Sequence, residues 1–159
     1  TASVPRTGSP RRRADPYNTQ VTEGPMDTSE LAAREGIREL IARYTHLGDG
    51  GRIAELVELF APDAQLDSHG QPYIGREEIS GFFTAIVDGS TPGPARTFIR
   101  HYISNVTIDM TSPTEASGAS YWTVLSDDGF ESSGRYRDTY RRSPDGSWRF
   151  ATRKIRRDQ

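Results

Sequence analysis

The sequence contains no cysteine and a single lysine, Lys154, and hydrophobic residues make up only 33% of it. The absence of cysteine excludes disulfide bonds, thiolate nucleophiles and zinc sites with cysteine ligands. No apolar run is long enough to span a bilayer, and no signal-peptide pattern opens the chain, so we expect a soluble, cytoplasmic protein that does not bind membranes. A chain of 159 residues has room for one domain.

The first residues also lack the side chains of a core. Val4 and Val21 are the only branched aliphatic residues in 1–25, and such a segment cannot offset the entropy cost of ordering. We therefore predict a disordered N-terminal extension over residues 1–26 and one domain over 27–159. Four of the arginines lie in this extension, which leaves the domain net acidic. An acidic domain does not have the charge needed to bind nucleic acid.

Helical spacing dominates the first half of the domain. Asp27 is placed to cap a first helix, with Glu30 reaching back, and Asp49 lies in the glycine-rich segment that ends it. The apolar residues on one face of this helix are Leu31, Ile37, Leu40, Ile41, Tyr44 and Leu47. A shorter helix with Ile53, Leu56, Val57 and Phe60 inward ends at Ala61-Pro62-Asp63, before a short strand over 64–67. A third helix over 75–87 buries Ile79, Phe82, Phe83 and Ile86.

Strand patterns and turn residues fill the second half. We expect strands over 97–110, 117–125, 134–141 and 148–155. In the first of these the apolar residues change from odd to even positions, which requires a bulge near Ser104-Asn105. Helices followed by such a meander predict an α+β fold, with three N-terminal helices packed on a strongly bent, mostly antiparallel sheet.

An ordered set of short motifs resembles the SnoaL-like branch of the nuclear transport factor 2-like (NTF2-like) superfamily. The motifs are Tyr44-Thr45-His46-Leu47-Gly48-Asp49, Leu59-Phe60-Ala61-Pro62-Asp63-Ala64, Tyr73-Ile74-Gly75-Arg76-Glu77, Arg100-His101-Tyr102-Ile103-Ser104-Asn105, Gly134-Arg135-Tyr136-Arg137-Asp138 and Trp148-Arg149-Phe150-Ala151-Thr152-Arg153. The resemblance implies a cone-shaped α+β barrel. Its enzymes include ketosteroid isomerase, scytalone dehydratase, bile-acid dehydratase, hexachlorocyclohexane dehydrochlorinase, limonene epoxide hydrolase and polyketide cyclases, while other members only bind ligands or serve as oxygenase subunits.

The resemblance also implies which residues act. In the dehydratase and dehydrochlorinase group, an Asp after the first helix and a His on the first long strand form a catalytic dyad, and Asp49 and His101 match these positions. Tyr44 and Arg153 match two assisting residues. Relatives need no cofactor and assemble as homodimers or homotrimers, so we expect the same here, with a small apolar molecule as the partner.

These residues make a coherent proton-transfer site. Imidazole has an ordinary pKa of about 6.5, so His101 is available as a base, while Asp49 fixes its tautomer. Tyr44 and Arg153 are suited to stabilising the negative charge that develops. Such a site fits a lyase, isomerase or cyclase acting on a polycyclic or polyketide-like substrate. We expect Phe83, Trp122 and Arg135 to contact that substrate.

Alternatives remain open for each of these residues. His101 as a plain strand residue and Asp49 as a turn residue would fit a non-catalytic protein that binds a small ligand or serves as a subunit. Tyr44 lies on the apolar face of its helix and would also fit a plain core residue. Arg153 lies in an arginine-rich segment and would also fit a solvated charge. A hydrolase of the epoxide-hydrolase kind would need two carboxylates around an arginine, for which Asp138 is one candidate. Asp67, His69 and His46 lack the spacing of metal ligands, and no metal site is predicted.

Overall fold

The computed structural model describes residues 27–88 and 98–158, so the predicted extension over 1–26 lies outside the described residues. The three helices lie in the first part of the described chain, where two strands separate the second helix from the third. The helices are α1 (Thr28–Asp49), α2 (Ile53–Val57) and α3 (Gly75–Val87). The strands are β1 (Phe60–Ser68), β2 (Gln71–Ile74), β3 (Ile99–Ser112), β4 (Glu115–Ser126), β5 (Gly129–Arg142) and β6 (Trp148–Arg157).

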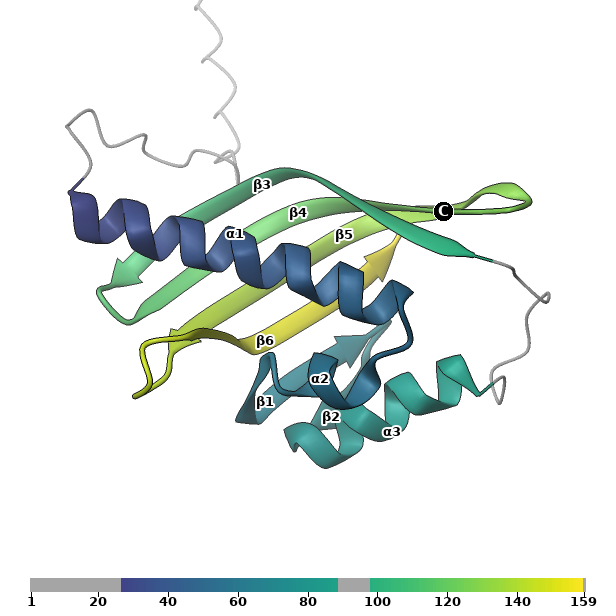
Figure 1. Cartoon of the computed structure of the whole chain (residues 1–159), viewed down its shortest axis with the longest axis horizontal. Helices are drawn as coiled ribbons and strands as arrows, with labels where there is room; N and C mark the ends of the chain where they lie inside the picture. Colours follow the sequence, from purple (N-terminus) through teal and green to yellow (C-terminus); the bar gives the residue numbers. More distant parts are fainter. Residues whose placement is uncertain (1–26, 89–97, 159) are drawn as a thin grey trace, which may run out of the picture.

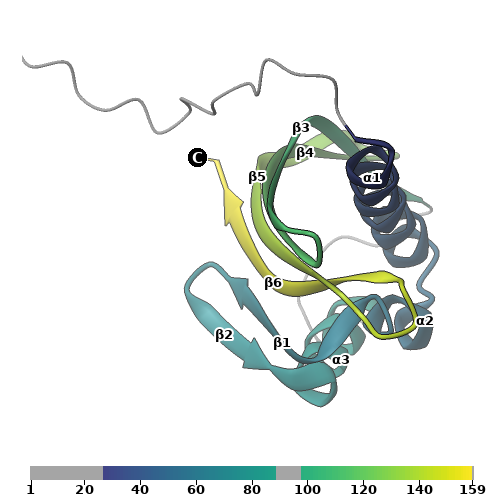
Figure 2. The ribbon, with the colours of Figure 1, turned by 90° about the vertical axis from the view of Figure 1, so that its left-hand side faces the viewer.

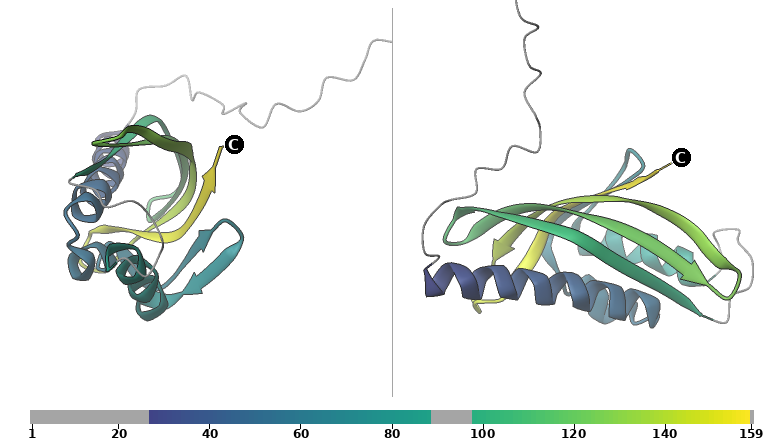
Figure 3. Two further views of the ribbon diagram at one scale, coloured as in Figure 1. Left: turned by 90° about the vertical axis from the view of Figure 1, so that its right-hand side faces the viewer. Right: turned by 90° about the horizontal axis from the view of Figure 1, so that it is seen from above.

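The strands form one curved sheet in the order β2-β1-β6-β5-β4-β3 (Figure 1). All neighbouring strands are antiparallel except β1 and β6, which are parallel. Figure 2 shows the sheet curving around α1, while α3 packs against β1 and β2. In Figure 3, α1 runs beside β3, which forms one edge of the sheet. The predicted α+β cone with a bent, mostly antiparallel sheet is confirmed.

The first helix begins where its cap was predicted. The Asp27 carboxylate accepts a hydrogen bond from the backbone N–H of Ser29. Glu30 does not reach back as expected, because its carboxylate binds Arg34 one turn later. The predicted apolar face is buried except for Leu31, which lies in the first turn and is half exposed.

The bulge predicted in the long strand is present in β3. The pairing of β3 with β4 shifts between Ser104 and Thr107, and Asn105 has a φ of 51°, in the left-handed region. Asn tolerates this conformation better than most residues. The extra residue keeps Ile103 and Val106 on the same inner face, where both pack against the core.

Three expectations for the first half were wrong. The strand predicted over 64–67 begins at Phe60, so Pro62 lies within β1, where the pairing with β6 is irregular. The short strand β2 was not foreseen, because Gln71 and Pro72 give it no apolar alternation. Ile86 lies near the end of α3 and is exposed.

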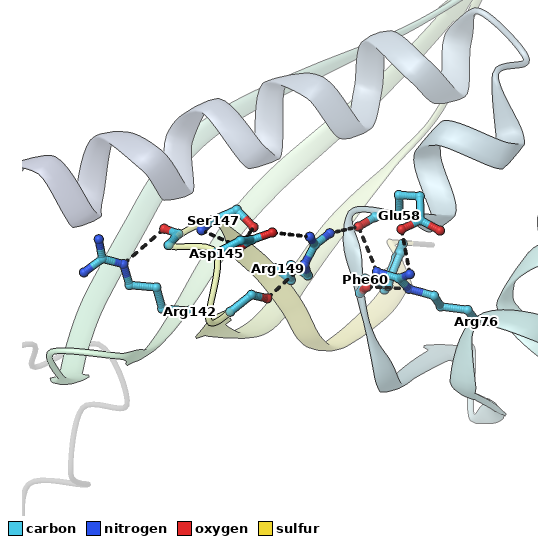
Figure 4. Close-up of polar contacts among 9 residues, drawn as sticks. Glu58, Phe60, Arg76, Arg142, Asp145, Ser147 and Arg149 are labelled. Atoms are coloured by element: carbon cyan, nitrogen blue, oxygen red, sulfur yellow. Dashed lines mark hydrogen bonds and ion pairs between the residues drawn. The ribbon is translucent and has the colours of Figure 1, made fainter.

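Arginine side chains join the α2–β1 corner to its neighbours (Figure 4). Arg149 donates to the Glu58 backbone carbonyl and binds the Asp145 carboxylate at 3.0 Å. Arg76 binds the Glu58 carboxylate at 2.6 Å and donates to the Phe60 carbonyl at 2.9 Å. These bonds attach the start of β1 to both α3 and β6, which fixes the end of the sheet opposite β3.

Candidate active site

Asp49 is the last residue of α1, and glycine ends the helix immediately after it. The Gly50 N–H donates to the His46 carbonyl at 3.1 Å, and Gly51 takes a φ of 67°, which favours glycine. The chain therefore turns away and leaves the Asp49 side chain pointing toward the neighbouring strand. In Figure 1 the last turn of α1 and the first residues of β3 lie at the same end of the molecule.

The Asp49 carboxylate holds His101 by two bonds. Its Oδ1 lies 2.6 Å from the imidazole Nδ1, and its Oδ2 accepts the His101 backbone N–H at 2.9 Å. Asp49 is 10% exposed and the His101 side chain 27% exposed. A carboxylate accepts hydrogen bonds, so in the neutral imidazole this contact favours the tautomer with the proton on Nδ1 and the lone pair on Nε2. The geometry therefore prepares a base with one free nitrogen.

A cavity of about 550 Å³ opens beside this pair. Its lining comes from the end of α1 and the start of β3: Thr45, His46, Asp49, Gly50, Arg100, His101 and Tyr102. This volume lies in the usual range for a small-molecule site. Of the residues expected to form the site, Asp49 and His101 thus lie together at a cavity.

Tyr44 and Arg153 lie behind this pocket, in the core. Arg153 is fully buried, and its guanidinium lies 4.1 Å from the ring centres of Tyr44, Tyr136 and Phe150. Asp138 binds it with both oxygens, at 3.0 and 2.8 Å. The solvated-charge reading of Arg153 is therefore wrong. Neither Tyr44 nor Arg153 is among the residues that line the cavity at His101.

Burial controls ionisation in this buried group. Burial by itself lowers the pKa of Arg153, but the Asp138 carboxylate reverses this effect and raises the pKa above its ordinary value. Burial raises the pKa of Tyr44, and the Arg153 charge offsets only part of that increase. Burial also raises the pKa of Tyr136, with the charge of Asp49 among the smaller causes. Both phenols are therefore neutral, and the field of Asp49 reaches the core.

The three expected substrate contacts lie in different places. Phe83 and Trp122 are buried in the core, where Trp122 stacks on Tyr136 at 5.9 Å. The indole lies flat across β5 because Gly134 has no Cβ, which would meet it at 2.5 Å. Arg135 lies on the outer face of β5 and binds Asp158 at 3.1 Å. The alternation of β5 places Arg135 opposite to the buried Tyr136, so it does not join the other two.

Sequence reasoning did not select three of the residues around His101. His46, Arg100 and Tyr102 line the cavity, although His46 was considered only as a metal ligand and the other two were not among the expected catalytic or substrate-contacting residues. Arg100 and Tyr102 flank His101 in its motif. Because β3 is an edge strand, both of these neighbouring side chains are exposed there. Asp138, the partner of Arg153, was considered only as a carboxylate of an epoxide-hydrolase site, and it is buried on β5 together with Tyr136 and Tyr140.

The described residues contain neither a membrane-crossing helix nor a cluster of metal ligands. None of the helices in 27–88 and 98–158 combines the length and apolar character that crossing a membrane requires. Across the same ranges, no three His, Asp or Glu residues come together as a group able to hold a metal ion. Asp67, one of the residues weighed as a ligand, instead binds Arg156 at 2.7 and 3.0 Å.

Solved structures with the same architecture include proteins of several bacteria. A protein provisionally named a scytalone dehydratase, from Novosphingobium aromaticivorans DSM 12444, is 24% identical, with a TM-score of 0.71 over 84% of this chain and 89% of that one. A protein of unknown function with a cystatin-like fold, from Nostoc punctiforme PCC 73102, is 27% identical, with a TM-score of 0.69 over 84% and 94%. ActVI-ORFA from Streptomyces coelicolor is 18% identical, with a TM-score of 0.69 over 80% and 98%.

The sequence itself matches a family description. Residues 29–154 match the model of the SnoaL-like domain, which covers the three described helices except for Thr28, and the described strands up to Lys154. The shared cone of helices on a curved sheet agrees with that match. The chain therefore belongs to the SnoaL-like family, within the NTF2-like fold.

Proposed function

We propose that the protein is a cofactor-independent enzyme in which His101 removes a proton from a carbon atom of a small substrate. The observation that carries this proposal is the two-point hold of Asp49 on His101 beside an open cavity. Asp49 fixes the ring and stabilises the imidazolium after proton transfer. Imidazole base catalysis contributes roughly 10²–10⁴-fold and needs no cofactor.

The proposed reactions are elimination, isomerisation and cyclisation, all of which begin with such a proton transfer. Polycyclic and polyketide-like molecules are the proposed substrates, since the resemblance to dehydratases and cyclases favours them. The names of the similar structures agree with this choice, as one is provisionally a scytalone dehydratase. A hydrolase of the epoxide-hydrolase kind has less support, because Arg153 is fully buried and, within the described residues, Asp138 is the carboxylate that binds it.

Hydrogen–deuterium exchange tests the proposal without knowledge of the product. Activated carbon acids, such as polycyclic ketones, are incubated in D₂O with the protein, and deuterium incorporation is followed by mass spectrometry. We expect wild-type protein to exchange at least one such ketone. His101→Ala and Asp49→Asn each lose roughly 10²–10⁴-fold, because one removes the base and the other reverses its tautomer.

The matched control is His69→Asn, which removes an exposed histidine in the β1–β2 turn and keeps a residue that accepts its positive φ of 56°. This variant keeps wild-type exchange. Variants of His101 and Asp49 that exchange as fast as wild type while remaining folded would refute the proposal. A protein that binds ketones but exchanges none of them would favour the binding-only alternative.

We also propose a homodimer or homotrimer that uses the outer face of the sheet. Tyr121 lies on β4 at this face and is 45% exposed. Large exposed aromatic side chains are typical of protein interfaces. Light scattering of the wild type and of Tyr121→Glu tests the assignment, and a wild-type monomer at all concentrations would contradict it.

A further inference from the structure

The pocket beside His101 contains polar groups that proton transfer does not use. Besides the dyad, its lining includes Arg100, His46 and Tyr102. An apolar substrate would remove water from these groups and give them no partner, which costs free energy. The part of the substrate that enters this pocket therefore carries polar atoms of its own.

Arg100 is a cation in the lining of this pocket. Its Nη1 donates to the Ile99 carbonyl at 2.7 Å, and its guanidinium carbon lies 5.8 Å from the ring centre of Phe98. In the part of the chain that the structure describes, no carboxylate contacts it. Within the same residues most other arginines bind a carboxylate, as Arg52 binds Glu55, although some, such as Arg137, also have none. Arg100 differs from Arg137 in lining the cavity, where its donors are available.

The negative group of the pocket lining is the Asp49 carboxylate, and it forms no ion pair with Arg100. Both of its oxygens contact His101, so neither is open as an acceptor for a ligand. The carbonyls at the end of α1 are occupied as well, since Gly50 and Arg52 donate to those of His46 and Leu47. The pocket therefore offers a guanidinium, an imidazole and a phenol to a ligand, and little competing acceptor.

We propose that the substrate carries a carboxylate, which Arg100 binds while the reacting carbon lies beside His101. A guanidinium forms two parallel hydrogen bonds with a carboxylate, which fixes orientation as well as charge. Arg100 is then a specificity-determining residue that selects anionic over neutral substrates. This inference rests on the proposed function for the position of the reacting carbon, but the anion site itself does not depend on turnover.

Paired probes of equal shape test the inference by binding alone. 2-Naphthoate and its neutral amide, 2-naphthamide, are titrated into the full chain and followed by NMR at the amide signals of residues 100–102. We expect the carboxylate to bind at least about fivefold more tightly than the amide at low ionic strength. Raising NaCl from about 20 to about 300 mM weakens binding of the carboxylate and leaves the amide unchanged.

Substitutions assign this preference to one side chain. Arg100→Gln lowers naphthoate affinity by at least about fivefold and changes naphthamide affinity less than about twofold, while Arg100→Lys retains part of the preference. The control Arg137→Gln removes an exposed arginine on the outer face of β5 and keeps the wild-type preference.

Several results would overturn the anion site: equal affinities of the two probes for wild type, no binding of either up to about 10 mM, or a preference that survives in Arg100→Gln. These results are separate from failure of the proposed function. His101→Ala removes exchange activity if the base is correctly assigned, whereas it leaves the charge of Arg100 and most of the naphthoate preference in place.

Discussion

Two carboxylates in this protein each hold a basic side chain by two contacts, and they differ in their surroundings. Asp49 binds His101 at the end of α1, beside an open cavity. Asp138 binds Arg153 between β5 and β6, where both side chains are 0% exposed and three aromatic rings surround the guanidinium. The first pair is accessible to a ligand, and the second is not.

This difference separates two roles that the motifs had joined. The resemblance groups Asp49, His101, Tyr44 and Arg153 as one site, whereas the structure divides them between a pocket and the core behind it. Removing one member of the buried pair, Asp138 and Arg153, is expected to lower the stability of the fold. Removing one member of the pair at the cavity, Asp49 and His101, is expected to lower the rate of proton transfer. The predictions below test whether the two pairs are as separate as their burial indicates.

The largest effect on stability is expected from Asp138→Asn. This change leaves the Arg153 charge buried without its counterion, which costs about 3–5 kcal/mol in the free energy of unfolding. Urea denaturation measures the loss, with Asp49→Asn, which changes a partly exposed carboxylate, as the comparison. A loss as small as that of Asp49→Asn would show that the buried pair is not the stabilising one.

The double variant Arg153→Met with Asp138→Leu removes both charges together. Because the desolvation penalty of the pair also disappears, we expect unfolding free energy within about 2 kcal/mol of wild type. Deuterium exchange in this variant then shows whether the Arg153 charge takes part in the reaction. Retained exchange would show that the reaction does not need the Arg153 charge. Loss of exchange with a stable fold would show that it does.

Tyr44→Phe gives a smaller and more specific test. The change keeps the ring against Arg153 and removes only the hydroxyl, whose pKa burial raises. Since Tyr44 does not line the cavity at His101, we expect exchange activity to change less than about threefold. A loss of about tenfold or more with an unchanged melting temperature would make Tyr44 the donor that the resemblance implies.

The smallest effect concerns a surface pair, Asp67 with Arg156. This contact lowers the pKa of Asp67 from 3.8 to about 2. A lowered pKa in the folded state adds stability above pH 3.8, and this contribution is lost as the pH falls toward 2. Asp67→Asn should therefore cost roughly 0.5 kcal/mol at neutral pH, and its difference from wild type should shrink in acid. A constant difference across this range would contradict the assignment.

The sequence predicted much of the fold because its signals are local. The bounds of α3 agree with the structure, and the cap at Asp27 begins α1. The bulge at Asn105 followed from a change in apolar parity. The strand β2 has no such pattern and depends on its pairing with β1. Pro62 reads as a stop, yet it lies within β1, which pairs with the distant β6.

The candidate site was predictable in part. The motifs selected Asp49 and His101, and the structure places them in contact. Burial of Arg153 was not predictable from alternation, because Trp148 and Phe150 face the core and a strict period would turn position 153 outward. The pairing with β5 shifts between Thr139 and Tyr140, which turns Arg153 inward toward Asp138. Arg100 and Tyr102 could not be recognised as pocket residues from the sequence, because their position depends on β3 being an edge strand.

One bond at the site also has a consequence for the molecule's behaviour in a crowded solution. β3 is an edge strand, and an edge with free N–H groups recruits strands from other chains. The Asp49 carboxylate covers the N–H of His101 and places a negative charge where an incoming carbonyl oxygen would dock. The side chain that orients the imidazole therefore also guards this part of the edge against aggregation.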